Sequence, residues 1–294
     1  MTLTPAVLRH PGARPDCRSC GGEGFVVARD AERAVAQFCS CVERCPECGG
    51  TGLVAVAPTF RAARRRCACK LVEQRMAAFD AVGIPARHAG STRASFVPAG
   101  QHQTAVLGAV SRWLAGYQPG AERGLVLYGE VGRGKTHLLV AMLRELVLVR
   151  GTAARFVEFS HLLADLKAGF DAGRGAAALL DPLVAVEVLA IDELGKGRHT
   201  DFESMVVDEL VSRRYNAMRP ILATTNFLPH AGTGRAVVGA AEAGLGLAPP
   251  PSLVDRVGER VYSRLRETCD FVEVKGEDYR EQPRRSAAPA ARLR

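Results

Sequence analysis

The sequence has little lysine and few aromatic residues for its length. Of its 294 residues only 6% are aromatic, and only 5 of its 39 basic residues are lysine. It also lacks a run of about 18 to 20 apolar residues, which a membrane span requires. The opening segment, MTLTPAVLRHPGARPDC, does not have the charged-then-apolar layout of a signal peptide. These absences predict a cytoplasmic protein with no membrane partner.

The remaining composition is that of a folded chain with a basic surface. Apolar residues make up 47% of the chain and charged residues 24%, which is enough for one large domain and a small one. The formal net charge is +8, so the surface should attract polyanions such as nucleic acid. If eight cysteine thiolates held two zinc ions, the net charge would fall to about +4.

Eight of the nine cysteines form a tandem repeat with a period of 28 residues. Each copy contains C-x2-C, an apolar stretch, a more polar arm and C-x-C, and the glycine-rich CRSCGGEGFVV returns as CPECGGTGLVA. Four thiolates in two close pairs are the ligand set of a closed, structural Zn2+ site, so the repeat predicts two zinc ions. Sequential and interleaved sharing of the pairs both fit the spacing. The predicted ligands are Cys17, Cys20, Cys39, Cys41, Cys45, Cys48, Cys67 and Cys69.

Two further features belong to this part of the chain. A module of roughly 55 residues with few aromatics has too small a core to fold alone, so we expect metal to supply its folding energy. Its second copy carries a basic cluster that fits contact with nucleic acid, a solvated face or a protein-docking surface. The cluster comprises Arg61, Arg64, Arg65, Arg66 and Lys70. The ninth cysteine, Cys269, is expected in the core.

A phosphate-binding loop follows a short apolar strand at 125–128 and precedes the apolar helix HLLVAMLRELVLV. Its sequence, GEVGRGKT, matches G-x4-G-K-[ST] in the strand–loop–helix setting that this motif needs. The glycines let backbone N–H groups surround a β-phosphate, Lys135 would bridge the β and γ oxygens, and the Thr136 hydroxyl would bind Mg2+. The motif therefore predicts ATP or GTP binding. The binding residues are Gly129, Gly132, Gly134, Lys135 and Thr136.

Two later strands supply polar groups for the same nucleotide. VEVLAIDE at 186–193 ends in two acids: Asp192 would hold Mg2+ through water, and Glu193 would polarise the attacking water, which makes the chain a hydrolase. ILATTN at 221–226 ends at Asn226, which can orient water or sense the γ-phosphate. We therefore expect Glu193 and Asn226 to be catalytic.

The rest of the pattern defines elements and boundaries. Helices are expected at 104–116, at 160–170 with Ser160 as N-cap, at 202–216 with Phe202, Met205, Val206 and Leu210 inward, and over 252–268. Strands are expected at 156–159 and 271–274. On spacing alone, Arg256, Arg260 and Arg264 form a solvated stripe. The expected parts are a flexible tail 1–14, a zinc module 15–75, a linker 76–103, an ATPase domain 104–280 with a mobile insertion at 229–251, and a basic disordered tail 281–294.

Residues 80 to 280 resemble the DnaC/DnaI-type bacterial replicative helicase loaders, AAA+ ATPases related to DnaA and IstB. The segments that carry the resemblance occur in order: GIPARH, GLVLYGEVGRGKTHL, RFVEFSHLLADLKAGF, VLAIDELGK, VVDELVSRRYNAMRPILATTNF, GERVYSRLRE and EDYR. The resemblance implies an α/β AAA+ fold with a parallel sheet. It also implies that Arg264 is a finger reaching the γ-phosphate of a neighbouring subunit, supported by Arg260, that Arg280 is sensor 2 and that Asn226 is sensor 1.

A finger supplied by a neighbour implies self-assembly on single-stranded DNA or on a hexameric partner. The leading hypothesis is an ATP-dependent loader that binds single-stranded DNA and delivers a replicative DNA helicase, with hydrolysis as the release switch. One alternative is an IstB-like ATPase helper of DNA transposition. Another is a zinc-dependent adaptor that uses ATP binding only as a switch.

Overall fold

The computed structural model describes residues 8–56, 63–230 and 250–279. Arg61, Arg280, the basic tail and all but the ends of the predicted insertion lie outside these ranges. The chain divides into two compact units, one of Met1–Val97, Val140–Ala153 and Arg284–Arg294, the other of Pro98–Leu139 and Ala154–Pro283. In the described ranges, no helix combines the length and apolar character needed to cross a bilayer.

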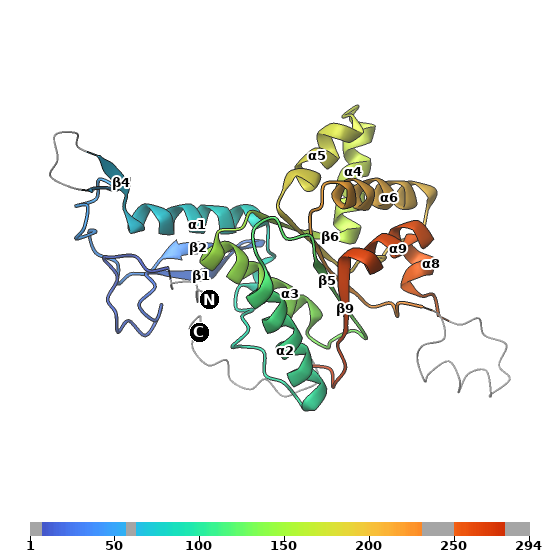
Figure 1. Cartoon of the computed structure of the whole chain (residues 1–294), viewed down its shortest axis with the longest axis horizontal. Helices are drawn as coiled ribbons and strands as arrows, with labels where there is room; N and C mark the ends of the chain where they lie inside the picture. Colours follow the sequence, from blue (N-terminus) through green and yellow to red (C-terminus); the bar gives the residue numbers. More distant parts are fainter. Residues whose placement is uncertain (1–7, 57–62, 231–249, 280–294) are drawn as a thin grey trace. The chain divides into compact units, whose positions relative to one another are not determined.

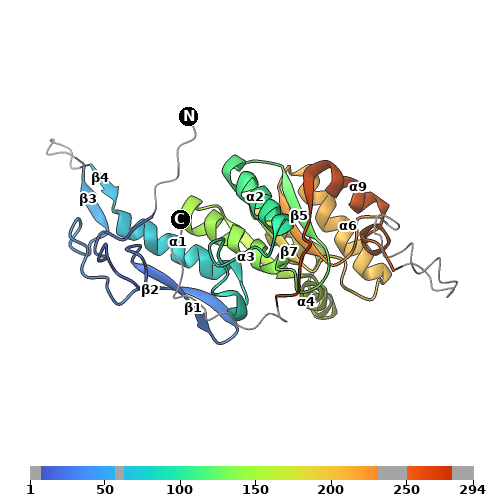
Figure 2. The ribbon, with the colours of Figure 1, turned by 90° about the horizontal axis from the view of Figure 1, so that it is seen from below.

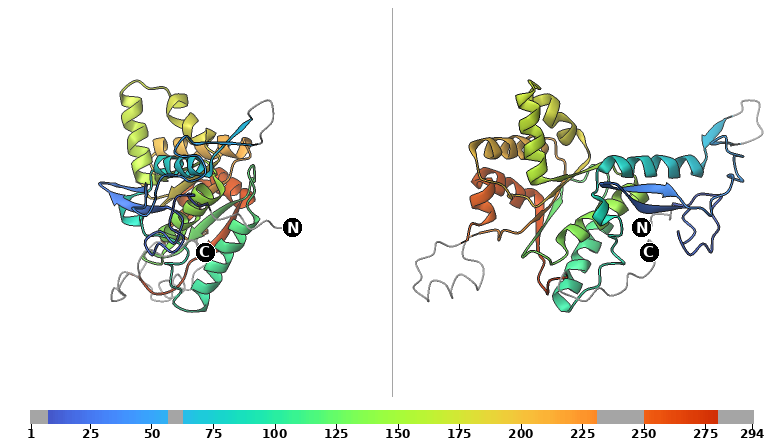
Figure 3. Two further views of the ribbon diagram at one scale, coloured as in Figure 1. Left: turned by 90° about the vertical axis from the view of Figure 1, so that its left-hand side faces the viewer. Right: turned by 180° about the vertical axis from the view of Figure 1, so that it is seen from behind.

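The first unit is built on two hairpins and a helix (Figures 1 and 3). Each cysteine copy forms one antiparallel hairpin between its C-x2-C and C-x-C pairs. The last part of the unit is a π-helical turn that follows the phosphate-loop helix. The elements are β1 (Phe25–Asp30), β2 (Arg33–Phe38), β3 (Leu53–Ala55), β4 (Arg64–Arg66), α1 (Ala68–Val82), η1 (Ala86–His88) and η2 (Glu145–Arg150).

Helix α1 organises this unit because one of its faces is apolar. Val72, Met76, Phe79 and Val82 are buried at helical spacing. The helix packs along β2, where the Ala36 N–H donates to the Asp80 carboxylate at 2.7 Å. The β1–β2 hairpin is thereby attached to α1, as Figure 3 shows.

The second unit is a five-stranded parallel sheet with the strand order β6-β7-β8-β5-β9. Every neighbouring pair in it is parallel, so the carboxyl ends of all five strands lie at one edge. Its strands are β5 (Gly124–Tyr128), β6 (Ala154–Glu158), β7 (Val188–Asp192), β8 (Ile221–Thr225) and β9 (Cys269–Glu273). Its helices are α2 (Gln101–Gly116), α3 (Lys135–Arg144), α4 (Phe159–Asp171), α5 (Ala176–Ala185), α6 (Asp201–Asn216), α8 (Leu253–Val257) and α9 (Glu259–Thr268). Helix α3 starts in this unit and ends in the first.

The main core of this unit lies on one face of the sheet. Alternate residues of the central strands, among them Val126, Ile191 and Ala223, pack there against α4, α5, α6, α8 and α9. Helix α2 lies on the other face, against β9 (Figure 2). Cys269 is 2% exposed in the main core, where the sequence placed it.

Three local expectations are wrong. Met205 is 59% exposed, because Val207 occupies the inward face of α6 instead. Ser160 lies inside α4, whose N-cap is Glu158, and its hydroxyl donates back to the Glu158 carboxylate at 2.7 Å. The helix expected over 252–268 is two helices, because Gly258 adopts a positive φ of 86° that an α-helix does not allow.

Candidate functional site

The phosphate loop joins β5 to α3 at the carboxyl edge of the sheet. Gly129 has a φ of 137°, and a Cβ there would lie 2.5 Å from the Val274 carbonyl oxygen. Gly132 has a φ of 81°, and a Cβ there would lie 2.1 Å from the Asp278 carboxylate. A side chain at either position would both strain the backbone and collide with a neighbour, so the loop requires glycine at these positions.

Lys135, the first residue of α3, is only 6% exposed and folds back over the loop. Its ammonium donates to the carbonyl oxygens of Gly129 at 2.7 Å and Glu130 at 2.6 Å. The positive charge is therefore held against the loop at the N-terminus of a helix, where an anion is favoured by the helix dipole as well.

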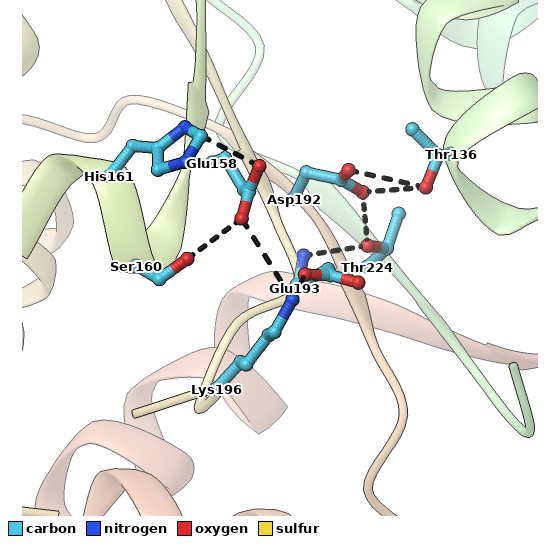
Figure 4. A network of polar contacts seen from close by, with 8 residues as sticks. All are labelled: Thr136, Glu158, Ser160, His161, Asp192, Glu193, Lys196 and Thr224. Atoms are coloured by element: carbon cyan, nitrogen blue, oxygen red, sulfur yellow. Dashed lines mark hydrogen bonds and ion pairs between the residues drawn. The ribbon is translucent and has the colours of Figure 1, made fainter. Parts of the chain in front are cut away.

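Asp192 and Thr136 meet beside this loop (Figure 4). The Thr136 hydroxyl donates to the Asp192 carboxylate, at 2.9 and 3.2 Å to its two oxygens. Thr224, on the adjacent strand β8, donates to the same carboxylate at 2.6 Å. Burial raises the pKa of Asp192, and the two threonine hydrogen bonds oppose that rise. Hydroxyl and carboxylate oxygens are the hard ligands that Mg2+ takes together with phosphate oxygens, so these donors fit Mg2+–nucleotide.

Glu193 directly follows β7 and has a φ of 57°, in the left-handed region that disfavours non-glycine residues. Its N–H donates to the Thr224 hydroxyl at 2.9 Å. Its carboxylate is ion-paired with the ammonium of Lys196. That ammonium also lies 3.9 Å from the carboxylate of Glu158, at the end of β6. Figure 4 shows Lys196 reaching between the two carboxylates.

Asn226 follows the last residue of β8, between the strands that carry the phosphate loop and the two acids. It is half-buried. The structure thus brings Lys135, Thr136, Asp192, Glu193 and Asn226 to one edge of the sheet. Sequence reasoning missed Thr224, Lys196 and Glu158. The paired threonines before Asn226 were the only signal for Thr224.

The predicted arginines lie elsewhere. Arg264, on α9, pairs with Asp208 of α6 at 3.0 Å and stacks over the Tyr215 ring with its guanidinium 5.8 Å from the ring centre. Arg260 is 75% exposed and lies 3.7 Å from the same carboxylate. In the described part of the chain, neither contacts the phosphate loop of its own chain. The stripe predicted to include Arg256 is broken, because Arg256 lies on α8 and donates to the Gly195 carbonyl at 2.9 Å.

The eight repeat cysteines form two groups of four, each with its sulfurs within 4.8 Å of one another. The grouping is the sequential one. Closest sulfur pairs are 3.7 and 3.5 Å apart in the first group and 3.6 and 3.5 Å in the second. A tetrahedral Zn2+ with Zn–S bonds of about 2.3 Å needs sulfurs about 3.8 Å apart, so both groups fit zinc. The groups are Cys17, Cys20, Cys39, Cys41 and Cys45, Cys48, Cys67, Cys69.

Backbone N–H groups also donate hydrogen bonds to the cysteine sulfurs, as is common in zinc sites. Gly24 donates to the Cys20 sulfur at 3.3 Å, and Gly52 donates to the Cys48 sulfur at 3.2 Å, so this bond also recurs after 28 residues. Backbone hydrogen bonds from Cys20 and Ser19 lower the pKa of Cys17 to about 6, which favours the thiolate that zinc binds. N–H···S bonds of this kind orient metal-binding thiolates.

Comparison with known proteins shows which ATP-binding proteins this chain is similar to. Residues 119–241 match the family described as IstB-like ATP binding protein. The chain is 31% identical over 102 residues to the replicative helicase loader DnaC of Escherichia coli, covering 34% of this chain and 41% of that protein. It is 30% identical over 176 residues to a protein described as ATP-binding in an insertion sequence of Mycobacterium tuberculosis, covering 60% of this chain and 61% of that protein.

These curated relatives are therefore matched over 41% and 61% of their length, and the cysteine repeat precedes the family match. The crystal structure of the DnaC helicase loader superposes with a TM-score of 0.52 at 25% identity, covering 64% of this chain and 99% of that chain. Residues 119–241 are thus similar to the IstB-like ATP-binding family, and the second unit has a parallel α/β sheet like that of the DnaC helicase loader structure.

Proposed function

We propose that this protein is an ATP-hydrolysing loader that binds single-stranded DNA and delivers a replicative DNA helicase. The observation that carries the proposal is the likeness to the DnaC loader structure, which 64% of this chain matches over 99% of that chain. The net charge of +8 is consistent with a nucleic-acid partner. We assign hydrolysis to the carboxyl edge of the sheet and helicase contact to the cysteine-bearing unit.

Nucleotide binding is assigned to the loop and its first helical turn. Lys135 would exchange its two carbonyl acceptors for phosphate oxygens. Thr136 and Asp192 would hold Mg2+, which when bound neutralises charge on the β- and γ-phosphates. The hydrogen bond between Thr136 and Asp192 holds the hydroxyl oxygen and the carboxylate oxygen next to each other, where both could bind the same Mg2+.

Hydrolysis is assigned to Glu193, with Asn226 as the residue that orients water or senses the γ-phosphate. The carboxylate of Glu193 can accept a proton from the attacking water once it leaves Lys196. Arg264 is assigned as the finger toward the nucleotide of a neighbouring subunit, and Arg260 as its support. Asp208 holds Arg264 on the surface between α6 and α9, so the finger would exchange this carboxylate for phosphate on assembly.

The proposal is tested with the zinc-loaded chain. We expect ATP turnover that rises with single-stranded DNA, and capture of the replicative helicase from the same organism in a nucleotide-dependent manner. Glu193→Gln should abolish turnover while retaining ATP binding. Glu209→Gln, an exposed carboxylate on α6, is the matched control and should turn over normally. Turnover without helicase capture would contradict the loader proposal.

A transposition helper is the second candidate, because the insertion-sequence relative matches 60% of this chain, more than the 34% matched by DnaC. Capture of a transposase in place of a helicase would favour it. A Glu193→Gln variant with full biological output would instead favour an adaptor that uses ATP binding only as a switch.

A further inference from the structure

The two cysteine hairpins are one scaffold used twice. In the first, Phe25 pairs with Phe38, and in the second Leu53 pairs with Arg66, each residue shifted by 28 positions. The other two pairs of the second hairpin, Val54–Arg65 and Ala55–Arg64, correspond in the same way to Val26–Gln37 and Val27–Ala36. Register and cysteine grouping therefore coincide in the two hairpins, so corresponding positions can be compared directly.

The inner face of each hairpin packs against the cysteine group of its own copy. Residues directly opposite in an antiparallel pair share a face, and the face alternates along each strand. Val54 packs against the second cysteine group, and its counterpart Val26 packs against the first. The inner faces of both hairpins therefore cover their metal sites.

The outer faces differ. In the first hairpin Phe25 is 4% exposed, because α1 and η1 pack against β1–β2. Its counterpart Leu53 is 43% exposed, and the three arginines of β4 are all exposed. In Figure 1 the β3–β4 hairpin lies beyond the first turn of α1. The position of Phe25 is thus buried in the first copy and open to solvent, as Leu53, in the second, whereas the residues opposite them, Phe38 and Arg66, are exposed in both.

The second copy also carries more positive charge than the first. Residues 17–44 contain four basic and four acidic side chains, whereas residues 45–72 contain five basic and one acidic. Arg64, Arg65 and Arg66 form no ion pair within the part of the chain that the structure describes. Arg64 and Arg66 share the outer face with Leu53, with Cα atoms about 7 Å apart, and like charges this close repel one another unless an anion lies between them. Arg65, opposite Val54, lies on the other face.

We propose that the β3–β4 hairpin binds the phosphate backbone of single-stranded DNA. Guanidinium groups match phosphate in a bidentate manner, and the pair Arg64 and Arg66 on one face, with Arg65 on the other, suits a flexible polymer with one charge per nucleotide. Leu53, which is exposed and directly opposite Arg66, offers an apolar contact to unpaired bases, which a duplex keeps stacked inside. This site rests on the single-stranded DNA binding of the proposed loader and assigns that binding to the hairpin, but it does not depend on ATP hydrolysis.

The test measures the salt dependence of binding. The full-length, zinc-loaded chain is titrated without nucleotide against a fluorescein-labelled oligothymidylate, by anisotropy, over a series of NaCl concentrations. Replacing Arg64, Arg65 and Arg66 with Gln should reduce the slope of log K against log salt by about 2, since each single-strand phosphate contact contributes about 0.7. Affinity in about 0.1 M salt should fall by about 10- to 100-fold. Replacing all three with Lys should retain most of the slope.

The first hairpin supplies the matched control. Arg18, Arg29 and Arg33 are also exposed, and replacing them with Gln removes the same charge from the same scaffold. This control variant should reduce the slope of log K against log salt by well under half of the reduction expected for the Arg64, Arg65 and Arg66 variant. Single variants Arg64→Gln and Arg66→Gln, each expected to lower the slope by about 0.7, keep the test valid if the triple variant loses zinc.

Equal slope losses in both triple variants would overturn the proposal, because they would indicate charge attraction without a site. Unchanged DNA binding in the β4 variant together with lost capture of an acidic protein partner would overturn it as well. ATP turnover without DNA, measured on the same variants, should stay at the parent level. A loss of this DNA-independent turnover would count against the ATPase proposal and not against DNA binding by the hairpin.

Discussion

Arg214 provides the sharpest test of how the second unit is held together. Its side chain, on α6, has no exposed surface, and no carboxylate pairs with it in the described residues. Its guanidinium donates instead to five backbone carbonyls around the end of α5 and the starts of β7 and β8. The acceptors are Leu183 at 2.6 Å, Val184 at 3.3 Å, Val186 at 2.9 Å, Glu187 at 3.1 Å and Pro220 at 2.7 Å.

The carbonyls of Leu183 and Val184 belong to the last turn of α5, where helix carbonyls have no partner within the helix. Arg214 therefore caps α5 and joins it to the sheet. Burial lowers the pKa of Arg214 to about 9, so the guanidinium is still protonated at neutral pH. Arg214→Ala would leave five acceptors without this donor and open a cavity, which together should cost about 4 kcal/mol. For a domain of this size the melting temperature should fall by about 8 to 16 °C.

The assay is thermal unfolding of the zinc-loaded chain by circular dichroism. Arg213→Ala is the control, because the neighbouring Arg213 pairs with the 57% exposed Asp181 and such surface pairs contribute less than about 1 kcal/mol. Arg214→Lys should recover less than half of the loss, since an ammonium has three donors and cannot reach both groups of carbonyls. Equal melting temperatures for the Arg213 and Arg214 alanine variants would refute the reasoning.

Three further outcomes follow from the site geometry. Lys135→Ala should weaken nucleotide binding about 10- to 100-fold, measured by calorimetry, because a charged hydrogen bond to phosphate is lost; unchanged affinity would remove Lys135 from the site. Lys196→Met should raise ATP turnover about two- to fivefold, because the ammonium no longer competes with water for Glu193, and a lower rate would show that the ion pair positions the carboxylate. Removal of zinc with a chelator should release two zinc ions and unfold both hairpins while the second unit stays folded, which NMR would detect. The control variant Cys269→Ser, outside the repeat, should still bind two zinc ions.

The two four-cysteine groups were predictable because their members are local and repeated. A period of 28 residues fixes which cysteines correspond, and the sequential grouping needs only that each hairpin bring its own two pairs together. The phosphate loop was predictable for a similar reason, since the strand, loop and helix are contiguous. Sequence spacing therefore captured the parts of the site that a single chain segment determines.

The parts assembled across the sheet were not predictable. Lys196 meets Glu158 only because β6 and β7 are neighbours in the strand order, although the two residues are 38 positions apart. Arg214 follows Arg213 in a polar stretch that is typical of a solvent-facing helix end, and its burial depends on where α5 ends. The break at Gly258 was missed because the apolar spacing on both sides of it is continuous.

The unusual backbone of Glu193 is explained by the two threonines of β8. The Thr224 hydroxyl accepts the Glu193 N–H, the Thr224 carbonyl accepts the Leu194 N–H at 2.7 Å, and the Thr225 hydroxyl donates to the Leu194 carbonyl at 2.8 Å. These three bonds fix the direction of the chain as it leaves β7, and they offset the cost of the positive φ. The same strand continues directly into Asn226. Strand β8 therefore sets the position of both residues assigned to hydrolysis, which makes Thr224 and Thr225 part of the site's architecture.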